Sequence, residues 1–68
     1  MISVRFVIQP HWEGGYVIFR ERQLAGAAAT LDEAQAFADN LAASETRAGL
    51  IGRVVRADLG GNLVGTTG

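Results

Sequence analysis

The sequence predicts an α+β domain with elements in the order ββαββ, in which one helix packs on one face of a mainly antiparallel sheet. Residues 2–9 alternate apolar and polar side chains, which indicates a strand with one buried face. Residues 30–43 repeat apolar side chains at helical spacing, and glycine pairs at 14–15 and 60–61 mark turns. Together these patterns predict one two-layer domain over residues 1–68 with strand order 2-1-3-4.

The first two strands are predicted to form a hairpin. The inward set of the first strand is Ile2, Val4, Phe6 and Ile8. Pro10 ends this strand, residues 10–15 form the loop, and the β-branched and aromatic run 16–20 forms the second strand. Two registers stay open for the second strand, because either Tyr16 and Ile18 or Val17 and Phe19 can face the helix.

The helix is predicted over residues 30–43. Thr30 is suited to cap its first turn, and Glu33 is expected to accept a hydrogen bond from the Thr30 amide in return. Five apolar side chains share one side of this helix: Leu31, Ala34, Phe37, Ala38 and Leu41. We expect this stripe to face the core, with its larger members covering the sheet.

The remaining segments complete the predicted order. Residues 21–29 have weak propensity for any regular structure and are predicted to form a loop. Residues 50–58 form the third strand, which a right-handed crossover places beside the first. A Gly-Gly-Asn turn at 60–62 then leads to a short fourth strand at 63–65.

Composition excludes several classes of function. Apolar residues make up 49% of the chain and the net charge is −1, so we expect a folded domain. There is no cysteine for disulfide or thiolate chemistry, and no apolar run approaches the ~20 residues that span a bilayer. The first ten residues alternate like a strand and lack the basic start of a signal peptide, so we expect a cytoplasmic protein.

No catalytic, cofactor or metal site is expected. His11 is the single histidine, so a pair of histidine ligands for zinc is impossible, and a site from His11, Glu13 and Asp58 would require a proximity that the sequence does not establish. The glycine-rich residues 60–65 lack the lysine of a phosphate-binding loop. We therefore expect a protein that is not an enzyme and binds no cofactor or small molecule.

Nucleic acid is the weaker alternative among partners. Five arginines and several aromatic residues could line a binding sheet: Arg5, Arg20, Arg22, Arg53 and Arg56, with Trp12, Tyr16 and Phe19. The isoelectric point of about 5.6 opposes this interpretation, because affinity for nucleic acid depends mainly on positive charge. Pairing of the arginines with Glu21, Glu45 and Asp58 is the expected alternative.

Two resemblances to known families rest on hairpin and capping motifs. Gly14-Gly15-Tyr16-Val17-Ile18, Thr30-x-x-Glu33-Ala34 and Gly52-Arg53-Val54-Val55 resemble small bacterial and phage ββαβ domains of unknown function. Residues 13–43 are also similar to the HicB-type antitoxins, whose partial ribonuclease-H-like fold has a GGY strand and a T-L-x-E-A helix. The second resemblance implies an antitoxin or regulator, often with a separate DNA-binding segment, which we do not expect after the final hairpin. Neither resemblance implies catalytic residues.

The predicted function is a non-catalytic interaction or structural module that binds another protein or forms a homodimer. A single helix covers one face of a sheet, which leaves apolar groups on the other face. Trp12 has two interpretations, as a cap on the open end of the core or as a recognition residue. The expected interface residues are Arg5, Val7, Trp12, Tyr16, Val17 and Phe19.

Overall fold

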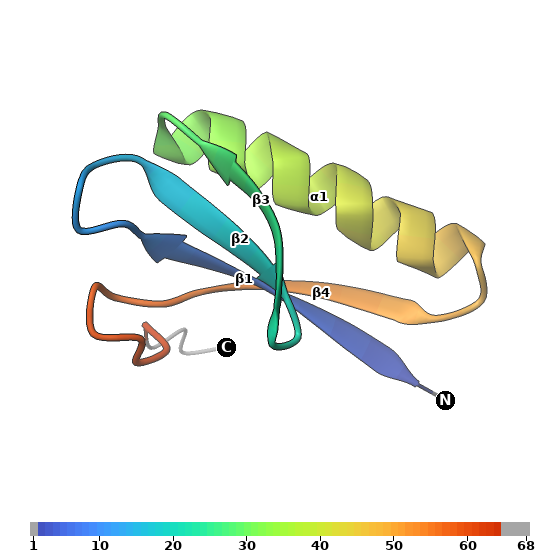
Figure 1. Ribbon diagram of the computed structural model, residues 1–68. Helices are drawn as coiled ribbons and strands as arrows, with labels where there is room; N and C mark the ends of the chain where they lie inside the picture. Colours follow the sequence, from blue (N-terminus) through green and yellow to red (C-terminus); the bar gives the residue numbers. More distant parts are fainter. Residues whose placement is uncertain (1, 65–68) are drawn as a thin grey trace.

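The computed structural model describes residues 2–64 as an α+β fold with one helix and a four-stranded mixed sheet (Figure 1). Its elements are β1 (Ser3–Pro10), β2 (Tyr16–Arg20), β3 (Gln23–Ala28), α1 (Leu31–Arg47) and β4 (Ile51–Arg56). The strand order is β3-β2-β1-β4, with β1 antiparallel to β2 and parallel to β4. The helix lies along one side of the sheet, between β3 and β4 in the chain.

The predicted strand order is wrong at both edges of the sheet. The predicted third strand corresponds to β4 and does lie beside β1, as the crossover rule requires. The remaining strand of the sheet is β3, which pairs with β2 at the opposite edge. It lies within residues 21–29, for which the sequence predicts a loop. After β4, the chain forms only an isolated antiparallel pair between Ala57 and Leu63, and Gly65 lies outside the described residues.

β3 forms because the backbone reverses directly after β2. Glu21 adopts a positive φ of 55°, which permits a two-residue turn through Glu21 and Arg22. The strand then pairs with β2 along its length, with one irregularity between Ile18 and Phe19. Its sequence, QLAGAA, has no β-branched or aromatic residue, so the strand is held by main-chain pairing and its own propensity is low.

The helix begins as predicted and ends later. The Thr30 hydroxyl accepts a hydrogen bond from the Glu33 amide at 3.2 Å, while the Glu33 carboxylate accepts from the amide of Ala29 instead of that of Thr30. The helix continues past Ala43 to Arg47, because residues 44–47 contain no glycine or proline to stop it. Gly49 follows with φ of 93°, a left-handed conformation that favours glycine.

The centre of the helix–sheet contact consists of alanines. Ala34, Ala38 and Ala42 are the buried residues of α1, whereas Phe37, expected to cover the sheet, is 37% exposed. The alanines let the helix approach closely enough that a Cβ at Gly52 of β4 would collide with the backbone of Ala42. The larger side chains of α1 therefore lie at the margins of its contact with the sheet.

The sheet contributes the large buried side chains. Val4, Phe6 and Ile8 of β1 and Ile18 of β2 are all at most 4% exposed, but Ile2 at the start of the chain is 67% exposed. The burial of Ile18 decides the register of β2, since it turns Tyr16 and Ile18 toward α1. Val17 and Phe19 therefore project from the opposite side of the sheet.

Candidate interaction surface

An apolar row crosses the side of the sheet that faces away from α1, which we call the open face. Paired residues of neighbouring strands lie side by side, so the register groups outward side chains into rows. One row contains a residue from every strand, in the order Leu24 of β3, Phe19 of β2, Val7 of β1 and Val55 of β4. Leu24 is 65% exposed and the other three are partly buried against their neighbours. We call these four residues the apolar row.

A charged row borders the apolar row on one side. Arg5 of β1 is paired in register with Arg53 of β4, and the Glu21 amide donates to the Arg5 carbonyl at 2.8 Å. Glu21, Arg5 and Arg53 thus form the next row across the face, which we call the charged row. With Ser3 and Val55 they line a shallow hollow of about 340 Å³.

The position of Glu21 follows from backbone chemistry. In an antiparallel pair the Arg5 amide would donate to the backbone carbonyl of the opposite residue, but the chain turns away at Glu21. Instead, the Glu21 carboxylate Oε2 accepts from the Arg5 amide at 2.6 Å. This hydrogen bond keeps a carboxylate at the edge of the face, in the hollow that Arg5 and Arg53 also line.

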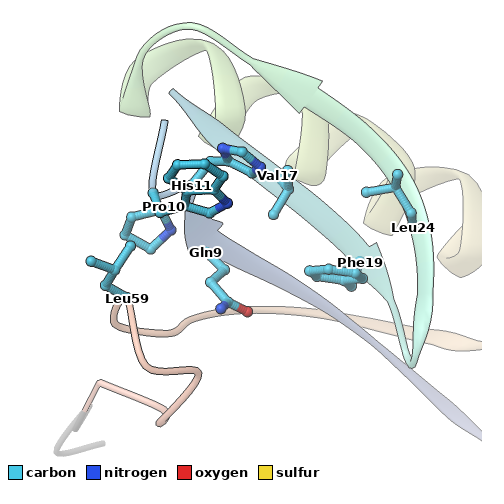
Figure 2. A pocket seen from close by; sticks show the side chains of 8 residues that line it. Gln9, Pro10, His11, Val17, Phe19, Leu24 and Leu59 are labelled. Atoms are coloured by element: carbon cyan, nitrogen blue, oxygen red, sulfur yellow. The ribbon is translucent and has the colours of Figure 1, made fainter. Parts of the chain in front are cut away.

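The other border of the apolar row is less polar. Gln9 of β1, Val17 of β2 and Ala27 of β3 form the next row in register. Beyond it, Trp12 and Leu59 complete a hollow of about 320 Å³ that also includes Phe19 and Leu24. Figure 2 shows Val17, Phe19 and Leu24 projecting from one side of β2 and β3, with Leu59 near Pro10 at the end of the hollow.

Trp12 does not cap the core. It is 78% exposed, because it lies in the turn after β1 and outside the sheet. Its indole stacks on the His11 ring with centroids 5.8 Å apart and an interplanar angle of 24°. A large aromatic side chain therefore stands in solvent at the rim of the open face.

The structure brings together four of the six expected interface residues. Arg5, Val7, Val17 and Phe19 share the open face, and Trp12 lies at its rim. Tyr16 points the other way and packs against the core, which removes it from this surface. The face also includes residues that are not among the expected six, among them Glu21, Leu24, Arg53 and Leu59. The sequence does not identify Glu21 and Leu24 as part of this face, because residues 21–29 carry no strand pattern.

The side chains considered for catalysis or metal binding serve turns in the structure. His11 Nδ1 accepts from the Glu13 amide at 3.1 Å, and Asp58 Oδ1 accepts from the Asn62 amide at 2.9 Å. Within residues 2–64, no three acidic or histidine side chains gather into a metal-binding group. Of the predicted arginine pairings, Arg20 does bind Glu45, with 2.9 Å between Nε and Oε1.

Comparison with known proteins finds no matching family model, no matching curated relative and no matching solved structure. The helix in the described part of the chain is not long and apolar enough to cross a membrane. The functional interpretation therefore rests on the geometry of the open face.

Proposed function

We propose that the protein is a non-catalytic protein-interaction module whose binding surface is the open face of the sheet. The observation that carries this proposal is the apolar row, which spans all four strands on the side that α1 does not cover. Scattered apolar residues are normal on protein surfaces, but a contiguous set bordered by charges is typical of an interface.

The construction of the face supports binding. Its residues belong to hydrogen-bonded strands, so the surface needs little ordering when a partner arrives, and that lowers the entropic cost of association. Phe19 and Trp12 supply aromatic area, and aromatic residues are enriched where interfaces are most strongly stabilised. The segment around Leu24, which could have folded over the face, is instead part of the sheet.

Site-specific photocrosslinking tests this function. A benzoylphenylalanine in place of Phe19 should crosslink to a protein, either another copy or a different chain, in cells of the source organism. The same group in place of Ala36 should give no such product, because Ala36 is exposed on α1 and lies outside the open face. Absence of any product from position 19, with the circular dichroism spectrum unchanged, would overturn the proposal.

An antitoxin of the HicB type is the second candidate. The two motifs behind that resemblance lie at the starts of two elements, since Gly14-Gly15-Tyr16 leads into β2 and Thr30 caps α1. This candidate predicts that a small toxin is encoded beside the gene and that co-expression relieves its toxicity. Val7→Glu, which places a charge in the apolar row, should abolish that relief; Ala36→Glu should not.

Binding to nucleic acid would use the same face differently. Arg5 and Arg53 lie next to each other there, but Glu21 lies beside them and the chain carries net charge −1. Net positive charge supplies most of the affinity for phosphate backbones, so we expect no retarded band in a gel shift at physiological salt. A retarded band that Arg53→Glu removes would instead favour a nucleic-acid regulator.

A further inference from the structure

We infer that the segment of the partner protein that docks on the open face is acidic, and that one of its carboxylates binds between Arg5 and Arg53. The inference rests on the proposed function, because it names the chemistry of the partner for the same surface. Three properties of the protein carry it: the pairing of two arginines in register, the net charge of the charged row, and the separation of positive and negative charge between the sheet and the helix.

Arg5 and Arg53 are like charges held next to each other. They are partners on adjacent parallel strands, about 4.8 Å apart, and both are exposed and line the same hollow. Like charges directly opposite one another on a sheet are destabilising. Within residues 2–64, the one ion pair is that of Arg20 with Glu45, so neither arginine of the charged row has a carboxylate within ion-pair distance. An anion between the two guanidinium groups would relieve their repulsion.

Glu21 leaves this pair of arginines available. Its Oε2 accepts a hydrogen bond from the Arg5 backbone amide at 2.6 Å, which holds the carboxylate at the main chain of β1. The charged row of Glu21, Arg5 and Arg53 therefore has a net charge of +1. One carboxylate neutralises the row, and its two oxygens can accept hydrogen bonds from both guanidinium groups. A phosphate group, with nearly two negative charges, would leave the row negative.

The distribution of charge directs an acidic segment to the sheet. The four strands contain four arginines and no acidic residue, whereas α1 contains four acidic residues and one arginine. α1 therefore carries a net charge of −3 on the side opposite the open face. An acidic chain is repelled from the helix and attracted toward the sheet, although the net charge of the whole protein is only −1.

The apolar row defines what else the docking segment must carry. Val7 lies two residues beyond Arg5 on β1, and Val55 lies two residues beyond Arg53 on β4. The two valines are therefore about 6.6 Å from the two arginines along the strands. A segment that presents an apolar side chain at this distance from a carboxylate fits both rows at once. The apolar contact also excludes water from the ion pair, which strengthens an interaction that is worth little when it is fully exposed.

The same layout suits a polypeptide better than a nucleic acid. The positive charge of the face is confined to one row, because the row of Gln9, Val17 and Ala27 on the other side of the apolar row is uncharged. Affinity for nucleic acid requires many phosphate contacts, and this face offers a single pair of arginines. An acidic and apolar protein segment uses both the charged row and the apolar row.

Hexanoate is a probe of this chemistry, since it combines a carboxylate with an apolar tail about as long as the separation of the two rows. Titration into the full chain, followed by the amide NMR signals, should give saturable shifts at Arg5, Val7, Arg53 and Val55 in the millimolar range. Hexanamide has the same tail and no charge, so it should bind about fivefold more weakly or not at all. Hexanamide binding as tightly as hexanoate would overturn the inference.

Three variants locate the charge that binds hexanoate. Arg53→Gln should weaken binding about fivefold, because one of the two guanidinium groups is lost. Glu21→Gln keeps an oxygen for the Arg5 amide and removes only the negative charge, so it should strengthen binding while leaving the urea midpoint of unfolding unchanged. Arg47→Gln removes the same charge as Arg53→Gln at the end of α1, where its contact is with Ser44, and should have no effect. Equal effects of the two arginine variants would refute a site on the open face.

The partner itself gives the second test. Mass spectrometry of the product that is crosslinked from position 19 should locate the contact segment, and an acidic residue is expected within four positions of the crosslinked one. Arg53→Glu should reduce the yield of this product, and replacing that acidic residue by arginine in the partner should restore it. A crosslinked segment without an acidic residue, or a yield unchanged by Arg53→Glu, would overturn the inference and leave the proposed function standing. Crosslinking of position 19 to nucleic acid in place of protein would overturn both.

Discussion

Gly52→Ala should push the helix away from the sheet, because the backbone of α1 lies directly against this glycine. A Cβ on Gly52 would collide with the carbonyl oxygen of Ala42 and lie 2.6 Å from its Cα. Both are backbone atoms of α1, so no side chain can rotate away. Ordinary contact begins near 3.4 Å, and the helix backbone must therefore withdraw by several tenths of an ångström.

The cost can be estimated from what that withdrawal disturbs. Moving α1 away at Ala42 also loosens the packing of Ala38 on β1 and opens space that neither alanine can fill. Overpacking of this kind costs roughly 1–3 kcal/mol, and replacing a strand glycine offsets about 0.5–1 kcal/mol of it. We expect a net loss of about 1 kcal/mol, which lowers the melting temperature of a domain this size by roughly 4–8 °C.

Urea unfolding followed by circular dichroism measures this loss. Gly60→Ala is the matched control, because a Cβ there meets only side-chain atoms at 3.5 and 3.8 Å and should change stability by less than about 0.5 kcal/mol. A Gly52→Ala variant as stable as this control would show that the helix does not contact β4 as described.

Four further substitutions test other parts of the fold. Thr30→Ala should cost about 1 kcal/mol in urea unfolding by removing the acceptor for the Glu33 amide, and an unchanged midpoint would contradict the cap. Phe37→Ala should cost roughly 2 kcal/mol, less than a fully buried phenylalanine, because the ring is 37% exposed. Gly26→Ala should destabilise the wild type by about 1 kcal/mol, since the new Cβ lies 2.5 Å from the Phe37 ring, yet it should be neutral or stabilising in Phe37→Ala; additive costs would refute that contact. His11→Ala should leave the urea midpoint of unfolding nearly unchanged, and a large loss would assign that side chain a role beyond its turn.

Most regular elements could be predicted from the sequence where side chains decide the structure. Alternation located β1, and helical spacing with a threonine cap located the start of α1. The crossover rule placed β4 beside β1. These features depend on patterns that one segment carries by itself, so they can be read without knowing its neighbours.

β3 could not be predicted because its own residues do not specify a strand. QLAGAA pairs with β2 since a turn at Glu21 brings it there, and small side chains leave room for the Phe37 ring over Gly26. The candidate site was incomplete for the same reason. Without β3 the apolar row lacks Leu24, and without the register of β2 the side of Tyr16 is undecided.

β1 pairs with one strand that is near it in the chain and with one that is far from it, and this difference has a consequence for the order of folding. β1 pairs with β2 through contacts such as Val7 with Phe19, 12 residues apart, but with β4 through contacts such as Ser3 with Ile51, 48 residues apart. A fourfold longer loop costs about 1.2 kcal/mol more to close before α1 shortens it. We therefore expect β1, β2 and β3 to form first and β4 to dock last, so that during synthesis one edge of the central strand stays unpaired until residues 51–56 have left the ribosome.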